Sequence, residues 1–142
     1  SPMMSLTPME IWTLRAGTRA AKGHTIVAGL GLGHQLMDVA NKKSVTKVTL
    51  VEKSKDLVDW IMPQLYDVRL GKPFLPKNKS IEVVVGDAYE EIPKMEADVA
   101  LMDIFPGYGG NREDCEGLMR KAKGVKRWWI WGSQSMGGSL WD

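Results

Sequence analysis

The sequence predicts an α/β fold built on a parallel sheet with helices on both faces, and three observations lead to this prediction. Short apolar runs alternate with helical patterns along most of the 142 residues. The apolar runs are continuous and rich in β-branched residues, as is typical of strands buried on both faces. With 44% hydrophobic residues, the chain can also bury a core. We therefore expect one domain around roughly five strands.

Composition excludes several classes of protein. The single cysteine, Cys115, excludes an internal disulfide framework and a cysteine-rich zinc site. A net charge of +2 argues against a strongly basic nucleic-acid coat and against an acidic tail. No apolar run reaches the roughly 18–20 residues that span a bilayer, and no leader is evident. We expect one domain over residues 1–142, cytoplasmic, without metal or membrane contact, with residues 1–2 a tag remnant and 132–142 a flexible tail.

The first element is a helix with a clear start and end. Thr7-Pro8-Met9-Glu10 combines an N-cap Thr, a proline at the first helical position and a Glu three residues after the Thr. Lys22 followed by Gly23 closes this helix. The apolar run 25–28 then predicts the first strand, and residues 34–43 predict a helix with one apolar face.

The middle of the chain continues the alternation. Residues 47–51 are apolar and β-branched, which predicts a second buried strand. Ser54 is placed to cap a helix over residues 55–65, and Pro63 should kink or split that helix. Residues 71–80 contain two prolines, a glycine and three lysines, so they predict a loop.

The second half of the chain adds three strands and two helices. The strands are expected over residues 81–85, 98–102 and 126–131, and the helices over 88–92 and 113–123. The last strand is rich in Trp, which suits a strand. If it lies at the edge of the sheet, its outward Trp side chains would form an exposed patch that seeks a partner.

A glycine-rich turn and three acidic residues carry the chemistry. Gly29-x-Gly31-x-Gly33 follows the first strand directly and opens a helix, so backbone can approach a ligand closely there. Glu52 ends the second strand, where a carboxylate can accept both hydroxyls of a ribose. Asp87 and Asp103 end the next two strands. All three acids should point into the crevice where open α/β sheets bind ligands.

The spacing of the glycines indicates which class of nucleotide cofactor the turn is suited to bind. A dinucleotide fingerprint would have its third glycine one residue later, where this chain has His34. The observed pattern instead resembles the class I S-adenosylmethionine-dependent methyltransferases, over roughly residues 25–131. The resemblance implies a Rossmann-like three-layer sandwich with a mostly parallel sheet. Because the chain ends shortly after the fifth strand, we expect it to lack the usual C-terminal antiparallel strand pair.

The resemblance implies S-adenosyl-L-methionine as the cofactor and assigns a role to each motif. The glycine turn would hold the methionine end, the acid after the second strand the ribose, and the Gly-Asp-Ala run the adenine. Asp103 would take or orient the proton of the nucleophile, and the residues after it would border the substrate. The implied cofactor residues are Gly29, Leu30, Gly31, Gly33, Glu52, Lys53, Asp87 and Ala88, and the implied substrate residues are Phe105 and Tyr108.

Two features bring the chain nearer to the spermidine-synthase-like branch. Many family members carry an acid two residues before the first glycine, where this chain has Val27, and Leu-Val-Glu-Lys resembles the Val-Glu of that branch. An aminopropyl transfer is therefore the alternative reaction. However, the second acid of that pattern is missing, because Phe105, Pro106 and Gly107 follow Ile104. A protein that binds the cofactor without catalysis is a third hypothesis.

The sequence says less about binding partners than about the cofactor. We expect a homodimer through the Trp-rich strand. The basic residues between Arg120 and Arg127 lead into that strand, and cations with nearby aromatics can bind nucleic acid. These cations also suit the end of a helix, so nucleic acid is the less favoured interpretation. The methyl acceptor is not identified by any motif.

Overall fold

The computed structural model of the chain describes residues 16–30, 33–66, 75–102 and 112–130, with side chains in the last range described from residue 116. Residues 16–20 are helical. The labelled strands are β1 (Gly23–Ala28), β2 (Val45–Glu52), β3 (Ser80–Val85), β4 (Ala97–Met102) and β5 (Val125–Ile130). The labelled helices are α2 (His34–Ala40), α3 (Lys55–Leu65), α4 (Ala88–Glu91), the 3₁₀ helix η2 (Ile92–Lys94) and α5 (Arg112–Lys121).

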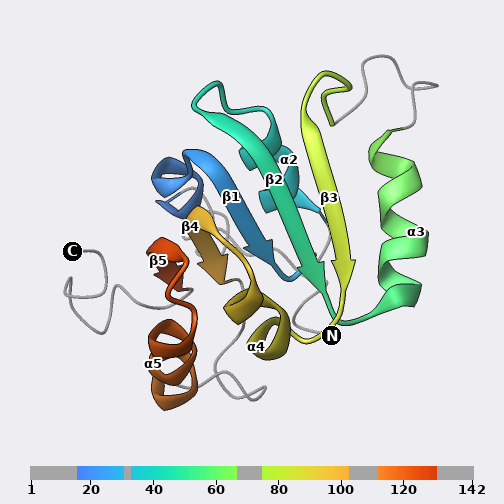
Figure 1. The fold of residues 1–142 in the computed structure, drawn as a ribbon. Coiled ribbons are helices and arrows are strands. Elements are labelled where there is room, and N and C mark those ends of the chain that lie inside the picture. Colours follow the sequence, from blue (N-terminus) through green and yellow to red (C-terminus); the bar gives the residue numbers. More distant parts are fainter. Residues whose placement is uncertain (1–15, 31–32, 67–74, 103–111, 131–142) are drawn as a thin grey trace.

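The five strands form one sheet in the order β3-β2-β1-β4-β5, and every neighbouring pair is parallel. All strands therefore begin on one side of the sheet and end on the opposite side (Figure 1). We call these two sides the amino-end edge and the carboxyl-end edge, as distinct from the edge strands β3 and β5. The register aligns the strand ends closely: Ala28 pairs with Val51 and with Met102. The predicted α/β fold on a parallel sheet is confirmed.

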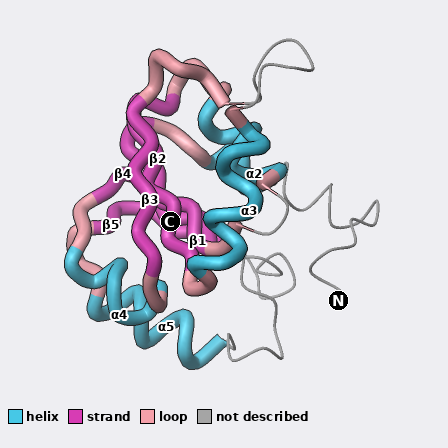
Figure 2. Tube along the Cα trace, turned by 90° about the vertical axis from the view of Figure 1, so that its right-hand side faces the viewer, coloured by secondary structure: helices cyan, strands magenta, loops and turns pink. Residues whose placement is uncertain are grey.

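Helices cover both faces of the sheet and make three layers. Figure 2 shows α2 and α3 on one side of the sheet, and α4 and α5 on the other. Successive strand residues face opposite sides. Val27 belongs to the core with α2 and α3, whereas Ile26 and Ala28 belong to the core with η2 and α5. The continuous apolar runs are explained by this burial on both faces.

The structure corrects two details of the predicted elements. The helix after Ser54 is not split, because α3 continues through Pro63 to Leu65. Pro63 lies in the last turn, where its missing N–H removes little from the helix. The predicted helix over residues 34–43 is shorter than expected, since α2 ends at Ala40 and Asn41 forms its C-cap.

The Trp-rich strand lies at the edge of the sheet, but the expected exposed patch is wrong for the two Trp residues described. Trp128 is 4% exposed and Trp129 is 2% exposed, one in each core. A Cβ on Gly17 would lie 2.9 Å from the Trp129 ring, so the helical residues 16–20 pack closely over it. The edge strand buries its aromatic rings because it is covered on both sides.

None of the helices in the described ranges combines the length and the apolar character needed to cross a bilayer.

Candidate functional site

The turn after β1 has a tight backbone that requires glycine. Gly29 has a φ of 98° and Gly33 a φ of 87°, both in the left-handed region. The N–H of Gly33 donates to the carbonyl of Leu30 at 2.8 Å, which closes the turn before α2. A Cβ on Gly33 would lie 3.0 Å from Leu65, so α3 packs directly against the turn. The two described ends of the turn, at Gly29–Leu30 and at Gly33, are therefore held in place.

Glu52 ends β2 and places its carboxylate against this turn. The residue is only 7% exposed. The N–H of Leu30 donates to its Oε1 at 2.8 Å, and the N–H of Ser54 donates to its Oε2 at 2.7 Å. A buried carboxylate is costly unless its charge is hydrogen-bonded. The two N–H groups thus hold both carboxylate oxygens of Glu52 in place.

Main-chain hydrogen bonds join the neighbouring turns to the end of β2. The N–H of Gly29 donates to the carbonyl of Val51, and the N–H of Gly86 donates to the carbonyl of Glu52, both at 2.9 Å. The turns after β1 and β3 therefore lie on either side of Glu52. The structure brings the predicted glycine turn, Glu52 and the Gly-Asp-Ala run together at one edge of the sheet.

Asp87 follows β3 and caps the short helix α4. Its Oδ1 accepts the N–H of Tyr89 at 2.9 Å, and its main-chain carbonyl accepts the N–H groups of Glu90 and Glu91. Helix N-terminal N–H groups are commonly satisfied in this way. Asp87 is partly buried, and Ala88 packs partly into the core with α5. Asp87 is therefore the N-cap of α4.

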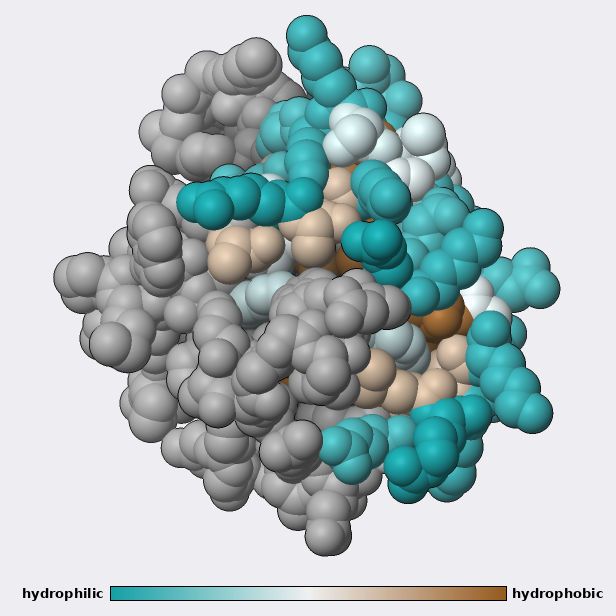
Figure 3. Space-filling model, turned by 90° about the vertical axis from the view of Figure 1, so that its left-hand side faces the viewer, coloured by the Kyte–Doolittle hydropathy of each residue, from teal (hydrophilic) through white to brown (hydrophobic). Residues whose placement is uncertain are grey.

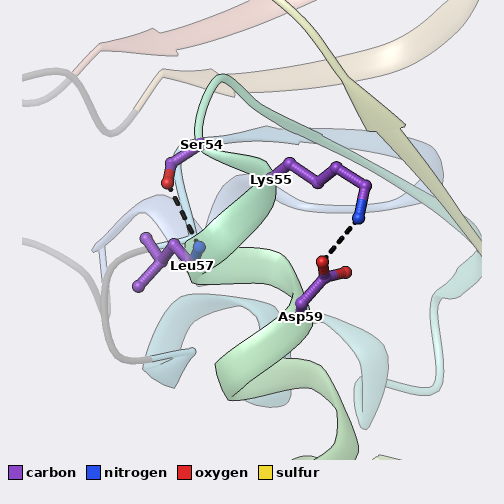
Figure 4. A network of polar contacts seen from close by, with 4 residues as sticks. All are labelled: Ser54, Lys55, Leu57 and Asp59. Carbon is purple, nitrogen blue, oxygen red and sulfur yellow. Dashed lines mark hydrogen bonds and ion pairs between the residues drawn. The ribbon is translucent and has the colours of Figure 1, made fainter.

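Helix α3 follows Glu52 closely, and Lys53 and Ser54 connect the two. Ser54 Oγ accepts the N–H of Leu57 at 3.1 Å, and Lys55 forms an ion pair with Asp59 at 2.6 Å (Figure 4). Ser54 thus uses its side chain to cap α3 and its N–H to hold Glu52. Lys53 is exposed.

Val85 is a residue of this edge that the sequence reasoning missed. It pairs in register with Glu52, so both side chains leave the sheet on the same face. Val85 is 46% exposed, like most of the edge strand β3, in which no residue is buried. The available signal was its position, a β-branched residue immediately before Gly86-Asp87. It offers apolar surface next to the acid.

Four predicted site residues lie outside the described ranges: Gly31, Asp103, Phe105 and Tyr108. β4 ends at Met102, which pairs with Ala28. The roles predicted for these four site residues therefore stay predictions. Within the described ranges, no three His, Cys, Asp or Glu side chains are grouped so that they could hold a metal ion.

The parallel sheet, with its glycine turn and strand-terminal acids, defines a class of fold rather than a known sequence family. No protein-family model matches the chain, and no curated protein matches it either. Solved structures do match. Precorrin-8W decarboxylase from Methanobacterium thermoautotrophicum has 21% identity and a TM-score of 0.56, over 86% of this chain and 61% of that one.

A candidate RNA methyltransferase from Pyrococcus horikoshii has 18% identity and a TM-score of 0.60, over 92% of this chain and 63% of that one. A spermidine synthase from Thermotoga maritima matches less well, with 21% identity and a TM-score of 0.46, over 61% of this chain and 32% of that one. This chain spans less than two thirds of the length of each. It shares the Rossmann-like α/β fold of the first two of these structures.

Proposed function

We propose that this protein binds S-adenosyl-L-methionine at the carboxyl-end edge of its sheet and transfers a methyl group to an acceptor. The observation that carries the proposal is the buried Glu52 carboxylate, fixed between the glycine turn and the start of α3. A buried charge is rarely kept at a strand end without a use. The methyltransferase-like fold supports the same proposal.

The residues present fit the nucleoside part of this cofactor. A carboxylate has about four lone-pair positions, and backbone N–H groups use two of those on Glu52. The remaining lone pairs can accept the two hydroxyls of a ribose. Because both oxygens of Glu52 are already held, little side-chain freedom would be lost on binding. Pre-organisation of this kind favours affinity.

The neighbouring residues suit the base. Val85 offers exposed apolar surface on the same face as Glu52, against which a flat adenine can pack. Asp87 uses Oδ1 to cap α4, and its carboxylate has further lone pairs to accept the amino group of adenine. Apolar contact and one acceptor together favour adenine over a purely polar ligand.

The charges at this edge are mixed. Glu52 and Asp87 are acidic and would attract the sulfonium and ammonium groups of the cofactor, whereas Lys53 is an exposed cation and Lys55 is paired with Asp59. A carboxylate at the end of the second strand also binds the ribose of nicotinamide dinucleotides. The feature that favours S-adenosyl-L-methionine over them is His34, which stands where their fingerprint has its third glycine.

The reaction follows from what the chain holds in place. The bound cofactor supplies an electrophilic methyl group. The glycine turn, Glu52 and Asp87 would fix its position, so that a large part of the rate gain comes from orientation. Asp103, directly after β4 in the sequence, is expected to orient the nucleophile or accept its proton. Aminopropyl transfer and binding without catalysis are the alternatives, and product analysis distinguishes them.

The proposal is tested first by calorimetric titration with S-adenosylhomocysteine. The wild-type protein should bind with measurable heat. In Glu52→Gln, the amide group cannot accept both N–H groups, so we expect affinity to fall about 10- to 100-fold. Glu82→Gln is the matched control, since Glu82 is an exposed acid on β3, and its affinity should equal that of wild type.

Two results would contradict the proposal. The first is a folded wild-type protein, checked by circular dichroism, that gives no heat with high micromolar S-adenosylhomocysteine. The second is an unchanged affinity in Glu52→Gln, which would remove Glu52 from the site. Binding without any methylated product over a panel of acceptors would support the cofactor site and argue against the transferase.

A further inference from the structure

Basic side chains gather at the edge of the sheet opposite to the candidate site. All strands begin there, because the sheet is parallel. In the described residues, the connections that lead into β1, β2, β3 and β5 each carry exposed Lys or Arg. We call this surface the basic edge, and it consists of Arg19, Lys22, Lys43, Lys77, Arg120, Lys121, Lys123, Lys126 and Arg127.

Hydrogen bonds make these connections immediate neighbours. The N–H of Gly23 donates to the carbonyl of Ser44 at 2.7 Å, and the ammonium of Lys79 donates to the carbonyl of Lys42 at 2.8 Å. The N–H of Ala97 donates to the carbonyl of Gly124 at 3.0 Å. With strands about 4.8 Å apart, the edge is about 20 Å wide. Figure 3 shows this side of the molecule, with hydrophilic side chains along its top and also down its right-hand margin.

Most of these cations have no acidic partner. Within the described ranges, Lys22, Lys43, Lys77 and Lys123 form no ion pair. Lys126 lies 3.6 Å from Asp98, but it is largely exposed, so the pair is weak. Lys55 and Lys94 are paired, with Asp59 and Glu91, whereas Lys53 at the opposite edge also forms no ion pair within the described ranges. The basic edge thus keeps its charge available.

The acids of the described chain are distributed differently. Glu96 and Asp98 interrupt the basic edge where β4 begins. Other acids lie at the opposite edge, among them Glu52, Asp87 and Glu90. The net charge of +2 therefore hides a separation of charge across the sheet. A local basic surface determines the attraction of a polyanion more than the net charge does.

We propose that the basic edge is a docking surface for the phosphate backbone of a nucleic acid. A row of exposed cations about 20 Å wide, among which Lys22, Lys43, Lys77 and Lys123 form no ion pair within the described ranges, can follow successive phosphates, which lie about 3.4 Å apart along each strand of a duplex. Binding would be governed by phosphate contacts, so it would be sensitive to salt and tolerant of sequence. The inference is independent of the proposed cofactor.

Two other occupants fit less well. Membrane surfaces are usually bound through cations together with bulky apolar groups. Of the four large apolar side chains that are exposed in the described ranges, Trp60, Val83 and Val85 lie away from the strand starts, and Tyr66 alone, at the end of α3, lies on the side where the strands begin. A second copy would have to offer its acidic edge, but Glu52 is buried there, Asp87 caps α4 and Glu91 is paired with Lys94. Of these acids and Glu90, only Glu90 is exposed and forms no ion pair within the described ranges.

The test measures binding of labelled RNA and DNA, as duplexes of roughly 20 base pairs and as single strands, by fluorescence anisotropy between about 50 and 200 mM salt. The test variant is Lys22→Gln/Lys43→Gln. The control is Lys55→Gln/Lys94→Gln, which removes the same charge from lysines that are already paired. The four probes distinguish RNA from DNA and duplex from single strand.

We expect the wild type to bind with an affinity that falls steeply with salt. For a duplex, the test variant should lower the logarithmic salt slope by about 1.8, because each phosphate contact contributes about 0.9. The control variant should bind like wild type. S-adenosylhomocysteine titration of the test variant should be unchanged, so failure here is separable from failure of the cofactor proposal.

Three outcomes would overturn the inference. One is no binding of any probe at the lowest salt. Another is an equal loss of affinity in both double variants, which would mean that only net charge acts. The third is binding to phosphatidylserine vesicles, or a dimer that the test variant disrupts, without binding to nucleic acid.

Discussion

At the scale of single residues, the buried charge of Glu52 is the most informative feature of the described chain. Three other polar residues are buried with it, namely Thr25, Gln35 and Thr49, and none of them carries a charge. Burying an isolated carboxylate costs several kcal/mol in real proteins, and hydrogen bonds offset only part of that cost. An apolar side chain would avoid that cost but would leave the N–H groups of Leu30 and Ser54 without their acceptor, so Glu52 joins the two turns in addition to the ligand role proposed for it.

His24 lies near the other end of β1 and should make stability depend on pH. The main-chain N–H of His24 donates to Asp98 Oδ2, and the ring Nε2 lies 2.8 Å from Thr49 Oγ1. Partial burial, and then Lys47, lower its pKa below the ordinary 6.5, although Asp98 and Glu82 oppose this. The unfolded chain therefore binds the proton more tightly than the folded chain, and stability should fall as pH drops below about 6.5.

Thermal unfolding between pH 7.5 and 5 measures this effect. His24→Gln should flatten the dependence on pH, whereas His34→Gln, which changes an exposed histidine on α2, should retain it. Asp98 does not titrate in this pH range. The main-chain N–H of His24 and, to a smaller extent, Lys126 lower the pKa of the Asp98 carboxyl below its ordinary 3.8. Equal pH profiles for wild type and His24→Gln would show that His24 is not the responsible group.

The sequence predicted where the site residues lie along the strands better than it predicted which groups they contact. Glu52 and Asp87 were placed at strand ends because the apolar runs before them end there. The hydrogen bonds from Leu30 and Ser54 to Glu52 could not be predicted, since they depend on the path of two turns relative to each other. Val85 was missed because exposure at the end of an edge strand has no signature in the sequence.

At the scale of elements, the described Trp residues illustrate a limit of sequence patterns. The strand itself was predictable from its β-branched and aromatic residues. The burial of Trp129 depends on Gly17, whose missing side chain allows a sequence-distant helical segment to pack over the ring. The burial of Trp128 depends on the core with α5. Neither contact follows from the strand alone.

A single lysine anchors the helical segment 16–20 to the rest of the fold. The ammonium of Lys42 donates to the carbonyls of Thr18, Arg19 and Ala21 at 2.7–2.9 Å. Cations at a helix C-terminus satisfy free carbonyls and complement the helix dipole. In Lys42→Met these carbonyls lose a charged donor, and we expect the free energy of unfolding to fall by about 1–3 kcal/mol.

Urea unfolding measures that loss, with Lys43→Met as control. Lys43 is the exposed neighbour in the same connection, and its substitution should change stability by less than about 0.5 kcal/mol. If both variants unfold at the wild-type urea concentration, water replaces the ammonium at no cost and Lys42 is not an anchor.

At the scale of the whole molecule, parallel topology explains why two different surfaces arise. Connections into strands meet at one edge of the sheet and connections out of strands meet at the other (Figure 1). The sequence allowed this topology to be predicted, because continuous apolar runs alternate with helical patterns. The charge separation was not predicted, since it emerges only when connections distant in sequence are neighbours at one edge.

The two proposed surfaces should act independently. A strand of six residues such as β1 is about 20 Å long, whereas charges are screened over about 8 Å at physiological salt. Direct electrostatic coupling between a polyanion at the basic edge and a cationic cofactor near Glu52 should therefore be small. We expect a saturating RNA duplex to change the calorimetric affinity for S-adenosylhomocysteine by less than about twofold, under 0.5 kcal/mol of coupling. A change above about fivefold would mean that the sheet transmits a conformational change, or that both ligands meet at one edge. Repeating the titration with Lys22→Gln/Lys43→Gln separates these cases, because coupling through the basic edge disappears in that variant and competition at the cofactor site does not.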